Sequence, residues 1–272
     1  MPQNKVKKKT VDLMGIVMLA LTVIGVAAAV IVVPEVRLFL GLEKNEFSNI
    51  ASTQASTDQT IYDLFPTFLG SKWKYQTSQT TKTKATNGEL NRVSVQGEYS
   101  QTVTFIFTGL SDQVKIVEFK MEGENYQTEC TSSSLISGDS FLWYVIDKDS
   151  LYIACSKETA NKIAAQIVHK ENTTDLPLPE YIAPMKLGTK WPEFSRDDTN
   201  NFDTSYVWYV ESIVPVTLPA GKYNDCYRIL LNTNPDTAIK YICPNVGLVS
   251  YFYSHNGSVN DYSVELIKYS LP

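Results

Sequence analysis

An uninterrupted apolar run from Leu13 to Val33 constrains this chain more than any other feature of its sequence. Thr22 is the only polar side chain in the run, which contains no charge. A helix rises about 1.5 Å per residue, so these 21 residues span about 30 Å, the thickness of the hydrocarbon core of a bilayer. Four lysines lie between residues 5 and 9, and clusters of Lys and Arg stay on the cytoplasmic side of a membrane. The run predicts a single-pass transmembrane helix at 13–33, with a cytoplasmic basic tail at 1–12 and the bulk of the chain extracytoplasmic.

A cleaved signal peptide is the alternative interpretation of this segment, because Ala27, Ala28 and Ala29 resemble a cleavage site. The apolar run continues for four residues beyond them, whereas the apolar region of a signal peptide has only about 7–15 residues. We therefore favour an uncleaved anchor in the cell membrane, which makes the lipid bilayer the first predicted partner of the chain.

Residues 34–60 are predicted to form a juxtamembrane segment and a flexible linker. The stretch 43–60 is rich in Ser, Thr, Gln and Asn and has only two large apolar residues, Phe47 and Ile50. Such a composition buries too little apolar surface to offset the entropy of ordering. As a coil, the stretch would span roughly 23 Å r.m.s..

The charge of the chain is unevenly distributed. The first 37 residues carry a net charge of +3, so the remainder carries −8 within the total of −5. An acidic ectodomain argues against a nucleic-acid partner, because nucleic-acid binding requires a clustered basic face.

Residues 61–272 have the pattern of a β-rich domain. Short runs of alternating apolar residues recur along them, and turn signals such as Thr108-Gly109, Glu122-Gly123 and Ser137-Gly138-Asp139 separate the runs. Such a pattern is typical of antiparallel strands and hairpins. The expected strands include 93–95, 103–107, 114–116, 141–146, 206–210, 226–231, 239–243, 248–253 and 262–269. Only Lys157–Lys170 has helical spacing, with Ser156 placed to cap it, so we predict a mostly β (α+β) fold in which one helix packs on a large antiparallel sheet.

An internal repeat divides this domain. Residues 66–73, PTFLGSKW, and 184–191, PMKLGTKW, both read Pro-x-x-Leu-Gly-[Ser/Thr]-Lys-Trp at an offset of 118 residues. The domain is therefore predicted to consist of two related halves, 61–182 and 183–272. Each copy is either a ligand-contacting corner or a structural corner with a buried Trp, and we favour the structural interpretation because nothing catalytic accompanies either copy. Its structural residues are Pro66, Gly70 and Trp73 in the first copy and Pro184, Gly188 and Trp191 in the second.

The second copy belongs to a longer series of motifs. It is followed by VTLPAGKYNDCYR at 216–228, CPNVGLV at 243–249 and ELIKY at 265–269. In this order the motifs resemble those of bacterial extracytoplasmic β-sheet proteins of unknown function, usually lipoproteins, with the pattern P-L-x-V-G-x-x-W, V-P-A-G-x-F and A-P-G-V-G-L-V. These proteins are similar in architecture to the curved-sheet carriers of the lipoprotein-localisation (LolA-like) type. The resemblance implies a large curved sheet and says almost nothing of function. The chain departs from the pattern by its membrane anchor and by Cys243 and Asn245, which stand where the pattern has Ala and Gly.

All four cysteines lie beyond the predicted anchor. An even number of cysteines in an oxidising compartment indicates disulfides, and four cysteines allow three connectivities. Each half of the repeat contains two, so we favour the local pairs Cys130–Cys155 and Cys226–Cys243. A zinc site is disfavoured, because the sequence has no Cys-x-x-Cys spacing and only two histidines.

Groups of adjacent aromatic residues leave open what covers the second face of their strands. Trp143-Tyr144, Trp208-Tyr209 and Tyr251-Phe252-Tyr253 must point to both faces of their strands. One face belongs to the core, and the other is covered by the helix or forms an apolar groove. Cover by the helix is the default expectation.

The sequence predicts no catalytic residues and no cofactor. His169 lies at a helix end and His255 beside a hairpin turn, and neither belongs to a nucleophile or metalloprotease motif. The chain is therefore expected not to be an enzyme. The expected role is a non-catalytic, membrane-anchored binding or accessory subunit with a membrane or envelope protein as partner. The alternative is a tethered carrier or sensor of a lipid or another apolar ligand.

Overall fold

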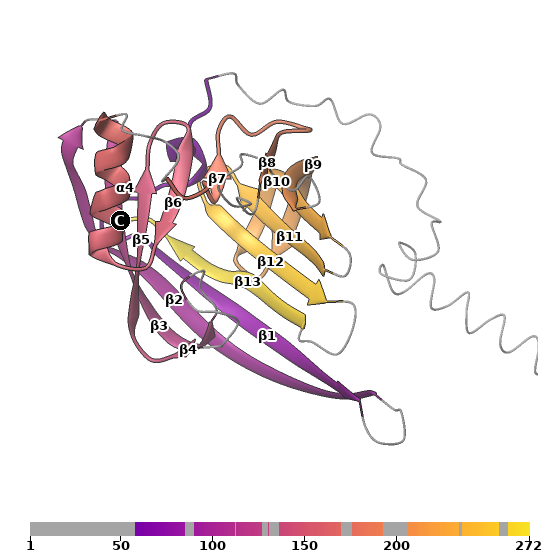
Figure 1. Ribbon diagram of the computed structural model, residues 1–272. Helices are drawn as coiled ribbons and strands as arrows, with labels where there is room; N and C mark the ends of the chain where they lie inside the picture. The colour runs from indigo at the N-terminus through magenta and orange to yellow at the C-terminus, as the bar shows by residue number, and fades with distance from the viewer. Residues whose placement is uncertain are drawn as a thin grey trace, which may run out of the picture. The chain divides into compact units, whose positions relative to one another are not determined.

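The computed structural model describes residues 58–84, 90–111, 113–126, 130, 136–169, 176–192, 206–233, 236–255 and 261–272 (Figure 1). The predicted basic tail, the transmembrane segment and most of the linker lie outside these residues. Within the described part of the chain, no helix is both long and apolar enough to cross a membrane.

One antiparallel sheet forms the domain. The strands of the first half are β1 (Lys72–Lys84), β2 (Leu90–Ser111), β3 (Val114–Tyr126), β4 (Ile136–Ser137), β5 (Ser140–Ile146), β6 (Ser150–Ala154) and β7 (Tyr181–Ile182). Those of the second half are β8 (Lys190–Pro192), β9 (Val207–Leu218), β10 (Gly221–Thr233), β11 (Asp236–Cys243), β12 (Gly247–His255) and β13 (Asp261–Ser270). This mostly β fold with an antiparallel sheet is the one predicted.

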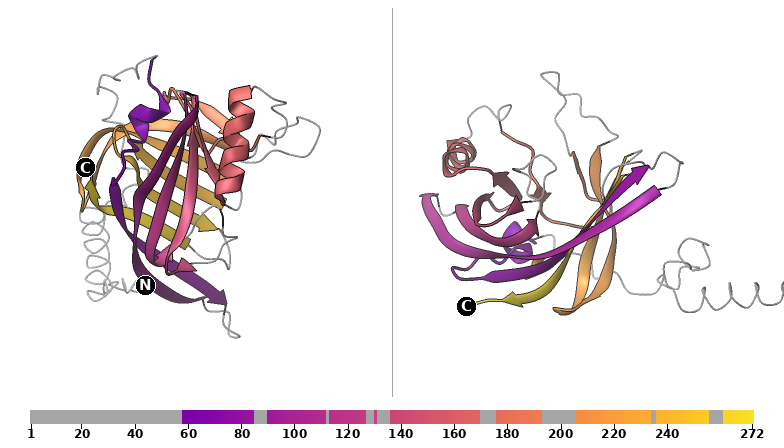
Figure 2. Two further views of the ribbon diagram at one scale, coloured as in Figure 1. Left: turned by 90° about the vertical axis from the view of Figure 1, so that its left-hand side faces the viewer. Right: turned by 90° about the horizontal axis from the view of Figure 1, so that it is seen from below.

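The two halves follow one another within the same sheet. The strand order is β7-β6-β5-β3-β2-β1-β13-β12-β11-β10-β9-β8, with β4 paired to β3 outside this path. Each half is therefore a meander, and the pairing of β1 with β13 joins the two. The strands at the two ends of the order, β7 and β8, are neighbours in sequence, separated only by residues 183–189. The sheet is strongly twisted and curved (Figure 2), and one large core cluster on its concave face contains residues of both halves.

Helix α4 (Lys157–His169) covers the other face of the sheet. Alternate residues of β3 separate the two faces, since Val117 and Phe119 belong to the large core cluster whereas Ile116 belongs to a smaller cluster with Ala160 and Ile163 of the helix. The predicted helix is confirmed over Lys157–His169, and the last residue of the prediction, Lys170, lies outside the described residues.

A second, one-turn helix, α3 (Ile61–Leu64), was not predicted. The Asp63 carboxylate accepts a hydrogen bond from the Thr60 backbone N–H at 2.7 Å, which fixes the first turn. Ile61 donates its backbone N–H to Lys148 O at 3.0 Å, and Asn245 donates its own to Asp63 O at 2.7 Å. The helix therefore contacts both halves, with Ile61 and Leu64 fully buried in the large core cluster.

Two residues that the sequence assigned to the linker, Gln59 and Thr60, make specific contacts in the domain. The Gln59 side chain donates to the Tyr227 hydroxyl at 2.9 Å and accepts the Met185 backbone N–H at 3.0 Å. Thr60 precedes α3 as its N-cap. Tertiary contacts therefore order Gln59 and Thr60, although the surrounding sequence is polar and has no periodicity.

Two predicted turns are wrong, because strands run through them. Strand β2 continues past Thr108-Gly109 with a shift of register between Phe107 and Ser111. Strand β3 continues past Gly123, which has a φ of 130°. A Cβ at position 123 would lie 2.3 Å from Glu98 O, so this glycine allows β2 to approach closely and does not mark a turn.

Asn245 explains one departure from the related sequence pattern. Its φ is 62°, in the left-handed region that glycine adopts freely and that Asn tolerates better than most residues. Asn245 is therefore compatible with the tight connection between β11 and β12 at the position where the pattern has Gly.

We predict that Gly123→Ala destabilises the domain more than Gly138→Ala. Both glycines have positive φ, so both substitutions carry the same kind of backbone strain, but no heavy atom lies within 4 Å of a Cβ at position 138. The steric overlap with β2 should lower the free energy of unfolding by about 1–3 kcal/mol beyond that shared strain. Urea unfolding of the two variants measures the difference, and equal midpoints would contradict the role assigned to Gly123.

Candidate functional site

The two repeat corners, residues 66–73 and 184–191, have the same backbone hydrogen bonds. In the first corner Gly70 N–H donates to Val103 O, and Val103 N–H donates to Ser71 O, both at 2.9 Å. In the second corner Gly188 and Thr189 exchange the equivalent bonds with Val210, also at 2.9 Å. Both glycines have positive φ, 87° and 80°. The sequence repeat is therefore a structural repeat in which each corner is fixed to the neighbouring strand.

The corner tryptophans are buried, as predicted, and each bonds to the opposite half. Trp73 Nε1–H donates to Val246 O at 2.8 Å, and Trp191 Nε1–H donates to Glu180 O at 3.2 Å. Both side chains are 4% exposed. The two indoles thus form hydrogen bonds between the halves of the domain.

The corner leucines are exposed, in contrast to the buried tryptophans. Leu69 and Leu187 occupy equivalent positions and are 61% and 65% exposed. Neither belongs to the core clusters, so the structural interpretation of the corner accounts for the Trp, Gly and Ser/Thr positions but not for the Leu.

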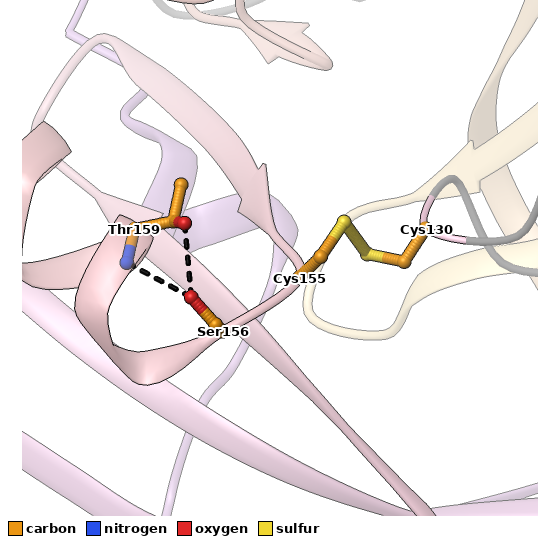
Figure 3. Close-up of a disulfide and its surroundings, with 4 residues drawn as sticks. All are labelled: Cys130, Cys155, Ser156 and Thr159. Atoms are coloured by element: carbon orange, nitrogen blue, oxygen red, sulfur yellow. Dashed lines mark hydrogen bonds between the residues drawn. A yellow bond between two sulfur atoms is a disulfide. The ribbon is translucent and has the colours of Figure 1, made fainter.

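Both disulfides join the cysteine pairs that the sequence favoured. Cys130 is bonded to Cys155, which lies between β6 and the cap of α4 (Figure 3). At that cap, the Ser156 hydroxyl accepts the Thr159 backbone N–H at 3.1 Å. Cys226 is bonded to Cys243, so β10 is linked to the end of β11. Two disulfides indicate an oxidising compartment and therefore an extracytoplasmic domain.

The concave face is lined by closely packed aromatic side chains. Tyr75 and Tyr99 stack with ring centroids 5.0 Å apart, and Tyr99 in turn contacts Tyr126 at 5.4 Å. Burial raises the pKa of the Tyr75 and Tyr99 hydroxyls well above the ordinary value for tyrosine. These groups therefore stay neutral at physiological pH and contribute packing and hydrogen bonding rather than charge.

A buried ion pair lies among these aromatics, and the sequence did not predict it. Lys240 of β11 is 6% exposed and forms a salt bridge with Glu180, the residue before β7. Its ammonium also lies 4.1 Å from the ring centroid of Trp208 and 5.2 Å from that of Tyr181. A buried cation requires such partners, since burial without them strongly disfavours the charged form. The ion pair connects β11 to one end of the sheet and therefore acts where β7 approaches the second half.

A sequence signal for this site existed. Lys240 alternates with Ala238 and Ile242, both buried on the same face of β11. A lysine in phase with core residues is a candidate for a buried charge, but the sequence does not identify Glu180, 60 residues away, as its partner.

The adjacent aromatics point to both faces, as expected. Tyr144 packs against the large core cluster, and Trp143 packs against the cluster under α4. Beside this helix, however, three phenylalanines remain 40–46% exposed. We refer to these residues, Phe105, Phe107 and Phe141, as the outer strip.

The outer strip lies on neighbouring strands of the sheet. Phe105 and Phe107 are on β2, and Phe141 is on β5, with β3 between them. Lys157, the first residue of α4, lies over the Phe105 ring with its ammonium 5.3 Å from the centroid. The strip therefore extends from the edge of the helix across the uncovered part of the same face.

The two histidines of the chain lie at different places in the fold. His169 is exposed at the end of α4, and the backbone of His255 pairs with that of Asp236 at the end of β12. Among the described residues, no group of three or more His, Cys, Asp or Glu side chains could hold a metal ion.

Comparisons with known proteins report distant similarity only. No family model and no curated protein matches the chain. Two solved structures are similar: a candidate exported protein with a YmcC-like fold from Bacteroides fragilis and a candidate lipoprotein from Parabacteroides distasonis. The first is 13% identical, with a TM-score of 0.36 over 76% of this chain and 99% of its own. The second is 19% identical, with a TM-score of 0.39 over 78% of this chain and 100% of its own. Similarity this distant assigns no family, and the resemblance to lipoprotein-localisation carriers stays a prediction.

We predict that Glu180→Gln lowers the free energy of unfolding by about 3–5 kcal/mol, because it leaves the Lys240 charge buried without its counter-charge. The double variant Glu180→Gln/Lys240→Met should recover most of that loss. The control is Glu98→Gln, which breaks the exposed pair with Lys74 and should change the stability by less than about 1 kcal/mol. Chemical unfolding measures all three variants, and equal effects of the two single substitutions would contradict the prediction.

We also predict that Trp73→Ala and Trp191→Ala destabilise the domain by similar amounts, about 3–5 kcal/mol each. Each removes a buried indole and leaves a backbone carbonyl of the other half without its donor. Differential scanning calorimetry should show a large fall in melting temperature for both variants. A variant that kept the wild-type melting temperature would show that its corner is not a structural anchor.

Proposed function

We propose that the chain is a membrane-tethered, extracytoplasmic and non-catalytic binding subunit, and that its outer strip binds an envelope protein. The observation that supports this most directly is the exposure of three phenylalanines on the part of the outer sheet face that helix α4 leaves uncovered. Aromatic residues are enriched in protein interfaces, where they supply a large apolar area with few rotatable bonds. Glu118, paired with both Phe105 and Trp143 in the sheet, adds a charge beside this apolar surface.

The packing of the concave face supports binding on the outside of the sheet. Phe119, Leu142 and Leu266, which point to the concave side, are all at most 5% exposed. Helix α3 adds Ile61 and Leu64 to the same core. A partner that binds the outer strip requires no rearrangement of this core.

A carrier of an apolar ligand is the second candidate function. It is favoured by the aromatic lining of the concave face and by the way β7 approaches the second half, where the described contacts are made by side chains such as Lys240 and Glu180. In this candidate function, a ligand enters the concave face between these side chains after they separate. This candidate therefore predicts bound lipid in natively purified protein and a larger amount of it after Glu180→Gln.

The binding function can be tested by comparing Phe107→Ser with Phe252→Ser. Both phenylalanines are 40% exposed, but Phe252 lies on β12 in the second half, outside the outer strip. Full-length protein should be cross-linked in membranes, and the protein captured should then be purified and titrated against each variant. Loss of a central aromatic contact weakens binding by about tenfold or more.

We expect Phe107→Ser to weaken binding by that factor and Phe252→Ser to leave it unchanged. Equal affinities of the two variants would contradict a role for the outer strip. Lipid without any protein partner in native mass spectra of the extracted complex would favour the carrier.

A further inference from the structure

The repeated corner retains two residues that its fold does not require. Gly70 and Gly188 have positive φ, the tryptophans are buried, and the hydroxyls of Ser71 and Thr189 accept the backbone N–H groups of Phe68 and Lys186 at 3.3 and 3.1 Å. These contacts account for the Gly, Ser/Thr and Trp positions of the motif. Of the other shared positions, the Pro is buried or half-buried, whereas the Leu and the Lys are exposed in both copies, as Leu69 with Lys72 and Leu187 with Lys190.

Both corners lie at the end of the domain at which the chain enters from the predicted linker. Gln59 accepts a hydrogen bond from Met185 within the second corner. From there the chain forms α3 and continues through Phe65 directly into the first corner. The described part of the chain therefore begins against one corner and reaches the other within a few residues.

More apolar surface is exposed at the first corner. Phe68, next to Leu69, is 55% exposed, and Leu271 follows Ser270, which pairs with Lys72. Each corner thus combines an apolar tip with an exposed lysine. This combination is typical of segments that lie in a membrane interface, where the apolar side chain enters the headgroup region and the lysine faces anionic lipid.

We propose that the two corners dock on the surface of the bilayer, with Leu69 and Leu187 in the headgroup region and Lys72 and Lys190 facing anionic headgroups. This inference rests on the membrane tether of the proposed function. It adds an orientation, in which the corner end of the domain faces the lipid and the outer strip stays available to a protein.

The tether allows this small apolar surface to dock on the bilayer. Two or three leucines and one phenylalanine bind a membrane weakly when the protein is free in solution. A predicted linker that spans roughly 23 Å keeps the corners close to the lipid, and this converts a weak contact into a highly populated one.

Photo-cross-linking of the full-length protein tests the orientation. Benzoylphenylalanine is introduced at Leu69, Leu187 or Val93, and each protein is reconstituted in vesicles of phosphatidylethanolamine and phosphatidylglycerol. Val93 is the matched control, because it is 61% exposed, as Leu69 is, but lies toward the far end of the β1–β2 hairpin. Lipid adducts at positions 69 and 187 should exceed those at position 93 by about fivefold or more.

Other outcomes overturn the inference in distinguishable ways. If the protein resists extraction by alkaline carbonate but the three positions give equal lipid adducts, the docking is wrong and the tether stands. If carbonate releases the protein, both the tether and the docking are wrong. Adducts of positions 69 and 187 with a second copy of the chain would make the corners a protein interface.

A charge variant tests the lysines separately. Lys72→Gln/Lys190→Gln should reduce the adducts at position 69 several-fold in vesicles with phosphatidylglycerol and leave them unchanged in vesicles of phosphatidylcholine alone. Equal adducts with and without the substitutions in the anionic vesicles would overturn the part of the proposal that concerns the lysines.

Discussion

The exchange of indole hydrogen bonds between the halves is the interaction on which the rest of the domain depends. Trp73 donates to a carbonyl of the second half and Trp191 to a carbonyl of the first. A curved sheet built from two meanders has one long ladder between its halves, here β1 with β13. The ladder fixes neighbouring strands but not the angle at which the halves approach each other. Two buried rings, each with its one polar atom bonded across the domain, set that angle because a different curvature would leave the indole N–H groups unpaired.

The opposite side of the domain is organised differently. Strands β7 and β8 have only two and three residues, and short edge strands limit unwanted pairing with other chains. Side-chain contacts connect the halves there in place of a long backbone ladder. Lys240 pairs with Glu180, and the centroids of the Phe65 and Tyr181 rings lie 4.8 Å apart. A buried ion pair adds little net stability compared with an apolar pair of the same size, because both groups lose hydration. Its contribution is geometric, since Lys240 is accommodated only when Glu180 and the rings of Trp208 and Tyr181 surround it.

Local patterns in the sequence predicted the parts of the fold that depend on local chemistry. The helix at 157–169 follows from its apolar spacing and from Ser156, and the repeated corners follow from a motif whose Gly and Trp have direct structural reasons. The glycine signals failed where a glycine permits close approach and not a turn, as at Gly123, since composition alone does not distinguish the two uses. Helix α3 was missed because its residues are fixed by contacts with Lys148 and Asn245, which are distant in sequence. The partner of Lys240 was missed for the same reason. The position of Lys240 between Ala238 and Ile242 on the buried face of β11 does indicate that the lysine itself is buried.

The distribution of apolar residues restricts where this domain can bind another molecule. Tyrosine and tryptophan side chains pack on the concave face, and several of their polar atoms bond to backbone carbonyls, as the Tyr75 hydroxyl does to Leu248 O at 2.9 Å. Side chains with buried hydrogen bonds of this kind cannot reorganise around a ligand without breaking several of those bonds. The exposed large apolar side chains lie elsewhere, and those of the outer strip and the corner tips are among them. The corner end and the outer strip are formed by different segments of the same sheet, so the domain can present both surfaces at once.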